Sequence, residues 1–189
     1  MTTDSARPAA CADRYARLSQ RFADLVAGVP DDVWQAPTPC PDWTVRELVS
    51  HVVESPAMFE QLVGRTLHPH PPVDDDPLAA MLAVREQVLA ELRDPDTAEA
   101  PFEGHFGPST FGEAVDRFVC FDLVVHGWDL ARATGQDDTI DAGEVDRLWQ
   151  DADLFGPALR SEGVCGPAVE PPAGADEQTR LLAHLGRRP

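Results

Sequence analysis

Apolar residues recur every three or four positions along most of this chain, and this spacing constrains the fold more than any other feature of the sequence. One face of an α-helix collects side chains at that period, whereas a half-buried strand alternates every second residue. Segments with strict alternation are scarce. We therefore expect an all-α protein, an antiparallel four-helix bundle with short additional C-terminal helices.

Start and stop signals locate the expected helices. Thr44 and Glu47 form a capping box, with Trp43 and Leu48 at the hydrophobic-staple positions, and this is the most sharply defined helix start in the chain. The proline- and acid-rich segment 68–77 is typical of a surface loop. The expected helices cover about residues 10–28, 45–67, 77–93, 110–134, 141–159 and 175–185.

Length and cysteine spacing favour a single intracellular domain. With 189 residues, 43% of them hydrophobic, the chain is long enough for one full core and too short for two, so we expect one domain over 1–189. The four cysteines are far apart and contain no Cys-x-x-Cys spacing, which predicts free thiols. The amino terminus lacks the pattern of a signal peptide, so a cytoplasmic location is expected.

The net charge of the chain limits the classes of partner that it is expected to bind. Acidic residues number 33 against 15 basic ones, a formal charge of −18, and no stretch is rich in Lys or Arg. A field of that sign repels phosphate backbones and anionic lipids, so we expect no nucleic-acid and no membrane partner. No phosphate-binding glycine loop or serine nucleophile motif occurs. A well-solvated surface is sufficient to explain the charge, and we expect a monomer or a homodimer.

A carboxylate and an imidazole stand four residues apart in the apolar run 118–128. Asp122 and His126 therefore share one helix face, about one turn apart, and a buried carboxylate needs a cation, a proton or hydrogen-bond donors. His51 follows the inward face of the helix that starts at Thr44. Two imidazoles and one carboxylate are typical ligands of a catalytic zinc ion or a similar divalent ion. The alternative is a structural hydrogen bond between Asp122 and His126, with His51 satisfied by a backbone carbonyl.

Three segments of the chain resemble one known family. They are residues 38–52 (TPCPDWTVRELVSHV), 121–135 (FDLVVHGWDLARATG) and 175–187 (ADEQTRLLAHLGR). The first two are similar to the actinobacterial branch of the DinB-like metalloproteins, and more narrowly to the amino-terminal domain of mycothiol-dependent maleylpyruvate isomerase. The third resembles the closing segment of uncharacterised relatives, so that the resemblance covers nearly the whole chain.

The resemblance implies a four-helix bundle that holds a divalent metal ion. The family's metal ligands correspond to His51, Asp122 and His126 here. The isomerase is similar to this chain but with Glu at the position of Asp122, and Asp reaches one methylene less. Zinc is the expected ion, with nickel, manganese and iron as alternatives.

The same resemblance implies a function in thiol chemistry. In mycothiol-using relatives the low-molecular-weight thiol binds near or at the metal, which favours the thiolate. The leading hypothesis is a metal-dependent mycothiol transferase or isomerase that acts on a small electrophile. Two alternatives remain open: a non-catalytic metal-binding or stress-response module, and a metal-dependent small-molecule hydrolase. The isomerase has a further domain with no counterpart here, so its own reaction is not carried over.

Asp129 is a second candidate for a catalytic role. It lies three residues after His126, where it would orient a ligand or accept a proton. The alternative is a pair with Arg132 or with a backbone donor near the helix end. Arg46 and Arg132 are candidate anchors for an anionic substrate, with surface solvation favoured for both.

Three aromatic or imidazole side chains carry weaker signals. Trp43 and Trp128 are interpreted as packing residues, with a place at the mouth of a pocket as the alternative. His105 lies in a glycine-rich connection, where it is either a surface residue or part of a lid or a fourth ligand.

Overall fold

The computed structural model describes residues 6–41, 43–161 and 164–188. Asp42 in the first resembling segment, the amino-terminal residues 1–5 and Gly163 lie outside the described residues. The helical elements are α1 (Ala6–Ala27), α2 (Val45–Glu54), α3 (Pro56–Leu62), α4 (Pro77–Arg93), α5 (Pro95–Ala98), α6 (Phe111–Ala114), the π-helix η1 (Val115–Val119), α7 (Cys120–Thr134), α8 (Ala142–Phe155), the 3₁₀ helix η2 (Gly156–Arg160) and α9 (Glu177–His184). The strands are β1 (Pro101–Gly104) and β2 (Gly107–Thr110).

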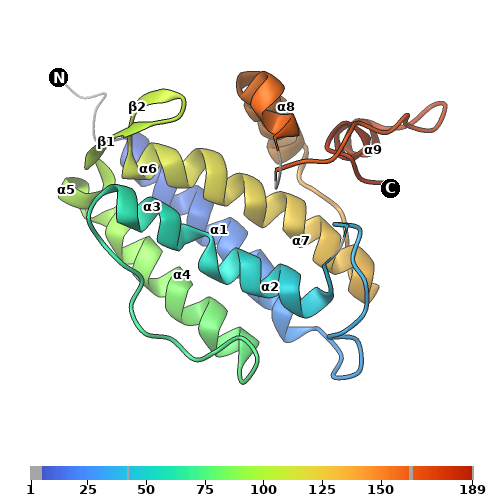
Figure 1. Cartoon of the computed structure of the whole chain (residues 1–189), viewed down its shortest axis with the longest axis horizontal. Helices are drawn as coiled ribbons and strands as arrows, with labels where there is room; N and C mark the ends of the chain where they lie inside the picture. The colour runs from blue at the N-terminus through green and yellow to red at the C-terminus, as the bar shows by residue number, and fades with distance from the viewer. Residues whose placement is uncertain (1–5, 42, 162–163, 189) are drawn as a thin grey trace.

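α1, α2, α4 and α7 pack around a common core. α1 packs against α4 and α7, and α2 packs against the same two helices from the other side (Figure 1). Each helix contributes large side chains that are almost fully buried, among them Tyr15, Phe22, Leu48, Leu92 and Leu130. α8 and α9 pack against each other, and α8 also contacts α7. The prediction of a mostly helical protein is therefore confirmed.

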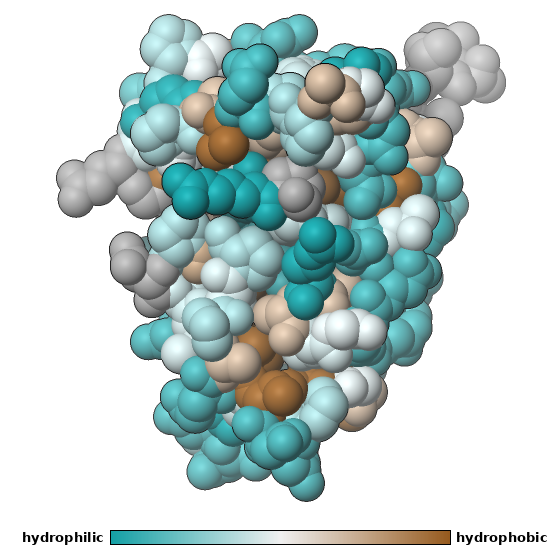
Figure 2. Space-filling model, turned by 90° about the vertical axis from the view of Figure 1, so that its right-hand side faces the viewer, coloured by the Kyte–Doolittle hydropathy of each residue, from teal (hydrophilic) through white to brown (hydrophobic). Residues whose placement is uncertain are grey.

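The surface is polar where Figure 2 shows it. Hydrophilic side chains cover most of this face, and hydrophobic ones gather in a few small areas. Among the residues that the structure describes, no helix combines the length and the apolar character that a membrane crossing requires.

The predicted start of α2 and both predicted ends of α4 agree with the structure. Thr44 and Glu47 form the predicted capping box at the start of α2. α4 has the predicted bounds, because the Asp76 side chain caps its first turn by accepting from the Ala79 amide and Pro77 supplies the fixed φ of a first helical residue.

The expected helix 45–67 is wrong as one continuous element. It divides into α2 and α3 at Pro56, whose missing amide proton cannot bond the preceding turn. The second piece ends at Leu62 because Gly64 adopts a left-handed conformation, with φ of 74°. Pro56 and Gly64 are both helix-breaking signals in the sequence. The apolar spacing of the segment nevertheless favours a single helix.

The all-α expectation also misses a small hairpin. β1 and β2 pair antiparallel, with Phe102 opposite Ser109, inside the segment expected to be an irregular connection. Four residues per strand are too few for alternation to be detected. Gly107, with φ of 97°, provides the reversal between them.

The expected helix 110–134 is continuous in the structure but not regular. The capping box of Thr110 and Glu113 begins α6, and a π-helical turn, η1, then leads directly into α7. Such turns insert an extra residue and are frequent near functional sites. Gly135 ends α7 with φ of 71°, as predicted from the sequence.

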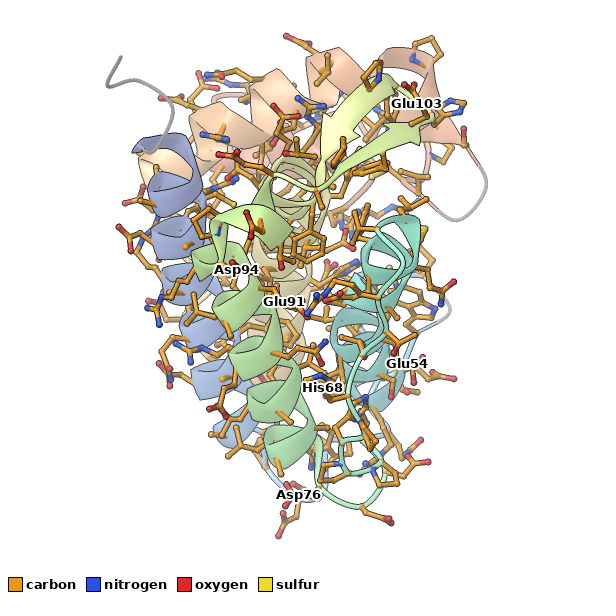
Figure 3. The ribbon with its side chains drawn as sticks, turned by 90° about the vertical axis from the view of Figure 1, so that its left-hand side faces the viewer. Glu54, His68, Asp76, Glu91, Asp94 and Glu103 are labelled. Atoms are coloured by element: carbon orange, nitrogen blue, oxygen red, sulfur yellow. The ribbon has the colours of Figure 1, made fainter. Side chains whose placement is uncertain are left out.

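A buried pair of carboxyl groups lies between α3 and α4. Glu60 is fully buried, and Glu91 occupies the space between α4 and the α2–α3 pair (Figure 3). Burial, and next the neighbouring Glu91 carboxylate, raise the pKa of Glu60 to about 8. Glu91 has a lowered pKa because hydrogen bonds, including one from the Arg65 side chain at 2.9 Å, outweigh its burial. The pair therefore holds a proton at neutral pH.

This proton makes stability depend on pH. In the unfolded chain Glu60 releases its proton near pH 4.5, whereas in the folded state it keeps it until about pH 8. The free energy of unfolding should therefore fall as pH rises from 4.5 to 8, by at most about 1.4 kcal/mol per pH unit. Glu60→Gln should flatten this dependence, measured by urea unfolding at pH 5 and pH 8. An unchanged slope in the variant would contradict the assignment.

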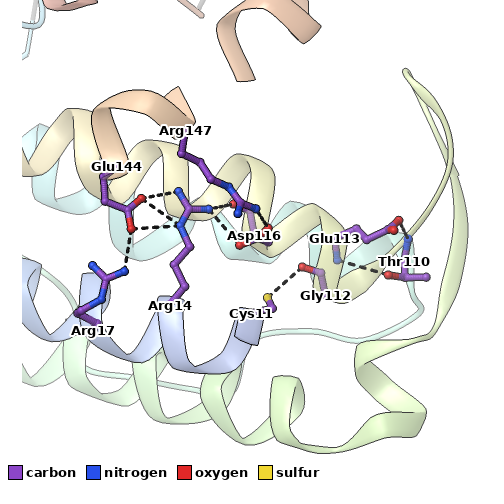
Figure 4. A network of polar contacts seen from close by, with 9 residues as sticks. All are labelled: Cys11, Arg14, Arg17, Thr110, Gly112, Glu113, Asp116, Glu144 and Arg147. Carbon is purple, nitrogen blue, oxygen red and sulfur yellow. Dashed lines mark hydrogen bonds and ion pairs between the residues drawn. The ribbon is translucent and has the colours of Figure 1, made fainter. Parts of the chain in front are cut away.

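An ion-pair network attaches α8 to the rest of the fold (Figure 4). The guanidinium of Arg14 on α1 donates to the Glu144 carboxylate at 2.7 Å and to the Asp116 carboxylate at 3.0 Å. Arg17 donates to Glu144 from the exposed side, and Arg147 pairs with Asp116. Arg14 and Glu144 are both buried, so each charge depends on the other.

Removal of the buried cation should destabilise the protein far more than removal of the exposed one. Arg14→Ala leaves Glu144 and Asp116 without their buried partner and should cost about 3 kcal/mol or more. Arg17→Ala is the matched control, because its 59% exposed side chain pairs with the same carboxylate and should cost about 1 kcal/mol or less. Urea denaturation of both variants measures the difference. Similarly small losses of stability in both variants would show that this network does not hold α8 in place.

Candidate metal centre

Packing of α2 against α7 brings together the three residues predicted from the sequence. His51 lies on α2, and Asp122 and His126 lie one turn apart on α7. The Nε2 atom of His51 is 3.4 Å from Oδ2 of Asp122, and the two imidazole centroids are 5.1 Å apart. One ligand atom from each of the three side chains lies within 4.8 Å of the other two. This spacing fits two nitrogens and one oxygen around a single cation.

The environment of Asp122 differs from the buried one that the apolar run suggests. Its side chain is 30% exposed and that of His51 is 34% exposed, whereas His126 is buried. The residues around Asp122 are apolar in sequence, but the helix turns this carboxylate toward an open cavity. Solvent and small molecules can therefore reach the cluster.

The structural hydrogen bond considered for Asp122 and His126 does not form. Both residues are among those that the structure describes, and there Asp122 pairs with His51 while Nδ1 of His126 lies 3.1 Å from Oδ2 of Asp129. An acceptor at Nδ1 favours the tautomer with its proton on that nitrogen. The lone pair of Nε2 is then free to bind an ion.

Asp129 orients His126 from inside the protein. Its side chain is fully buried, and both oxygens accept from the guanidinium of Arg187, at 2.8 Å and 3.2 Å. Burial alone would raise the pKa of Asp129, but the hydrogen bond from His126 and the charge of Arg187 outweigh it and lower the pKa. Asp129 does not pair with Arg132, which binds Asp138 at 2.9 Å. The geometry thus matches an orienting residue better than a proton acceptor in contact with substrate.

Arg187 reaches Asp129 because the chain reverses after α9. Gly186 has φ of 85°, and a Cβ atom there would lie 3.1 Å from the backbone oxygen of Gly166. The Arg187 amide then bonds the Leu182 carbonyl at 2.9 Å, as in a glycine-terminated helix. This turn directs the guanidinium inward, where it is 5% exposed.

The cluster lies in the wall of a cavity of about 890 Å³. Trp43 lies beside both imidazoles, with ring centroids 4.6 Å from His51 and 5.5 Å from His126. The sequence favoured packing over a place at a pocket mouth for Trp43, and in the structure Trp43 lines the cavity. The remaining lining side chains come from the loop before α2, from α2, α3, η1, α7, α8 and η2, and from the C-terminal segment.

A second set of candidate ligands overlaps the first. Cys40, His126 and Asp129 also have ligand atoms within 4.8 Å of one another. Asp129 is already neutralised by Arg187, and burial raises the pKa of the Cys40 thiol to about 11. Cys165, in the same cavity, has a raised pKa for the same reason. The set with His51 and Asp122 is therefore the better cation site. All four cysteines are free thiols, as predicted.

Other candidate residues lie away from the cluster. His105 is exposed in the hairpin turn and packs edge-on against Phe106. Arg46 donates to the Val73 carbonyl and lies over the Trp34 ring, so it is a packing residue rather than an anchor. Trp128 is buried, in agreement with its predicted packing role.

Sequence reasoning missed Arg187 as part of the site. The sequence does contain a Gly-Arg step after the terminal helix, where a glycine typically ends a helix. That segment was considered only for its resemblance to the family. No local pattern shows that a residue 58 positions after Asp129 will reach it, because this contact depends on tertiary packing.

The fold and the site together define a class of protein. It is mostly helical, and two histidines and a carboxylate converge on a cavity. The model of the mycothiol maleylpyruvate isomerase N-terminal domain matches residues 15–131, and the chain belongs to this family. It is also similar to two uncharacterized proteins of Mycobacterium tuberculosis, MT0763 of strain CDC 1551 / Oshkosh and Rv0738 of strain ATCC 25618 / H37Rv. Each is 34% identical over 182 residues, covering 92% of this chain and 95% of the relative. No solved structure matches the chain.

The ion pair between Arg187 and Asp129 should show strong coupling. Arg187→Met leaves a buried carboxylate without its cation and should cost about 3–5 kcal/mol. In an Asp129→Asn background the same change should cost less, because no bare charge remains. Urea denaturation of the four proteins measures the coupling.

Arg188→Met is the matched control for this cycle. Arg188 is the exposed neighbour of Arg187, so its loss should change stability by no more than about 0.5 kcal/mol. Equal effects at both arginines, or additive effects of Arg187→Met and Asp129→Asn, would contradict the buried pair.

Proposed function

We propose that this chain is a divalent-metal-dependent thiol transferase or isomerase that acts on a small electrophile, with mycothiol as the thiol. The observation that carries the proposal is the convergence of His51, Asp122 and His126 at the wall of a large cavity. Membership of a family named for a mycothiol isomerase supplies the thiol. In this proposal α1, α2, α4 and α7 are the four helices of a DinB-like bundle, and residues 1–189 form one domain.

The donor set fits a divalent cation. Two neutral imidazoles and one carboxylate are typical of zinc, and they also suit nickel, manganese and iron. Asp122 reaches the cluster despite being one methylene shorter than the Glu of the isomerase, since its Oδ2 is 3.4 Å from His51. A bound divalent ion would lower the pKa of a coordinated thiol and so favour its nucleophilic form at neutral pH.

The protein's own side chains prepare this site in three ways. Asp129 and Arg187 fix the orientation of the His126 ring from the buried side. Trp43 packs against both imidazoles and limits their rotation. Burial raises the pKa of the Cys40 and Cys165 thiols in the same cavity, which disfavours their thiolate forms in the metal-free protein.

Exposure of the cluster favours a catalytic site over a purely structural ion. A structural zinc is enclosed by four protein ligands, whereas here His51 and Asp122 are each about one-third exposed and face the cavity. A non-catalytic metal-binding or stress-response module and a metal-dependent hydrolase are the competing functions. We expect a cytoplasmic monomer or homodimer whose partners are small molecules.

Metal analysis tests the site directly. Protein purified without chelator or nickel resin should contain about one divalent ion per chain, and His51→Ala and His126→Ala should lose it. His68→Ala is the matched control, because His68 lies exposed in the loop before α4 and should leave the metal content unchanged. Equal metal content in all four proteins would refute the proposed ligands.

A thermal-shift measurement then tests the thiol. A ligand that binds only the folded state raises the melting temperature, by the equivalent of about 2.7 kcal/mol at one hundred times its Kd. Mycothiol should stabilise the metal-loaded wild type more than glutathione does, and His51→Ala should lose this difference. Metal content without any shift from mycothiol would support the non-catalytic module or the hydrolase instead.

A further inference from the structure

Three phenylalanine rings form a stacked column beside the candidate metal centre. Phe59 of α3 and Phe118 of η1 have ring centroids 5.4 Å apart and planes 10° apart. Phe118 and Phe155, the last residue of α8, repeat this arrangement at 5.4 Å and 9°. The rings come from three separate elements, so the column is a product of tertiary packing.

Two further rings extend the column on either side. Phe106, from the turn between β1 and β2, lies 5.9 Å from Phe118 and 5.8 Å from Phe155. Phe121 of α7 packs against Phe155 at 5.4 Å with a tilt of 63°. The name aromatic wall is used here for Phe59, Phe118, Phe121 and Phe155, which all line the same cavity as His51 and Asp122.

The aromatic wall begins next to the candidate ligands. Phe121 directly precedes Asp122, and Phe118 lies four residues before it in a continuous helical segment. Four helical residues correspond to about 6 Å along the axis and return to nearly the same face. Phe59 and Phe155 cover the faces of Phe118, so a ligand ring packed edge-on against Phe118 would hold an attached carbon near the cluster.

The cavity is larger than an ion requires. Its 890 Å³ lies in the range of roughly 300–1,000 Å³ that is typical of sites for small organic ligands. Apolar side chains at this cavity remain open to solvent, with Met58 59% exposed and Val164 54% exposed. Exposed apolar surface inside a concave site is typical of a ligand-binding surface.

The chemistry of the wall selects the ligand. Phenyl faces and edges attract other π systems in offset-stacked or edge-on geometry, which adds to the burial of apolar area. A thioether, as in Met58, also contacts aromatic rings favourably. The charged groups that line the cavity, Glu54, Asp122, Arg160 and Arg187, lie outside the four rings of the wall.

We propose that the aromatic wall binds the planar, uncharged aromatic body of the electrophile and presents its reactive carbon to the metal cluster. This inference rests on the proposed function and names the substrate class of the same site. Phe118 is the main specificity-determining residue, because it is the half-buried ring of the wall, whereas the other three rings are buried, and because it lies one turn from Asp122.

Binding of 2-naphthol, a planar uncharged probe, tests the proposal by calorimetric titration. The wild type should bind it at least threefold more tightly than its saturated counterpart, decahydro-2-naphthol, which has the same carbon skeleton without a π system. Phe118→Leu should weaken binding of 2-naphthol by about three- to tenfold and leave the affinity for the saturated ring nearly unchanged. Equal affinity of the wild type for both compounds would overturn the proposal.

A second variant tests the wall with Phe118 intact, so that a folding defect caused by Phe118→Leu does not decide the result. Met58→Glu changes a side chain that is 59% exposed and places a charge at the apolar side of the cavity, so it should weaken 2-naphthol binding about tenfold. Leu82→Ala is the control, because Leu82 is exposed on α4 outside the cavity and should bind as the wild type does. Wild-type affinity in both Phe118→Leu and Met58→Glu would overturn the assignment.

The metal site and the aromatic wall can fail independently. Chelator-treated wild-type protein should bind 2-naphthol with the same affinity as the metal-loaded protein, and Met58→Glu should keep the wild-type metal content. Loss of metal with intact naphthol binding therefore concerns the proposed function alone. A concentration-dependent dimer that Met58→Glu abolishes would assign the wall to a second copy of the chain and overturn the proposal.

Discussion

The packing of α2 against α7 is the contact on which the rest of the site depends. It places a histidine from the first third of the chain beside a carboxylate and a histidine that follow it by 71 and 75 residues. Neither helix holds the three groups alone. Leu48 of α2 and Leu130 of α7 are both almost fully buried in the core that these helices share. Burial of apolar side chains therefore fixes the distances between polar ones.

The polar groups are arranged in two layers with opposite exposure. Asp122 and His51 face the cavity, whereas Asp129 and Arg187 are buried behind His126. The inner pair is electrically balanced, so that the orienting carboxylate does not compete for a cation. The carboxylate of Asp122 faces the cavity, where a cation can reach it. This division lets two aspartates on one helix, seven residues apart, serve different purposes.

The sequence predicted those parts of the fold that depend on local signals. The capping box at Thr44, the bounds of α4 and the helix face shared by Asp122 and His126 follow from residues within one or two turns. The break at Pro56 was readable but was outweighed by the apolar period. The contacts of Arg187 with Asp129 and of Phe118 with Phe59 join distant segments, and no local pattern encodes them.

The reversal at Gly186 changes where the functional unit ends. The family model matches residues 15–131, yet the guanidinium that neutralises Asp129 comes from position 187, well beyond that boundary. A segment cut at Ala131 would retain every candidate metal ligand and still expose a carboxylate that the full chain conceals. In this protein the domain drawn from sequence similarity and the unit that builds the site are therefore of different lengths.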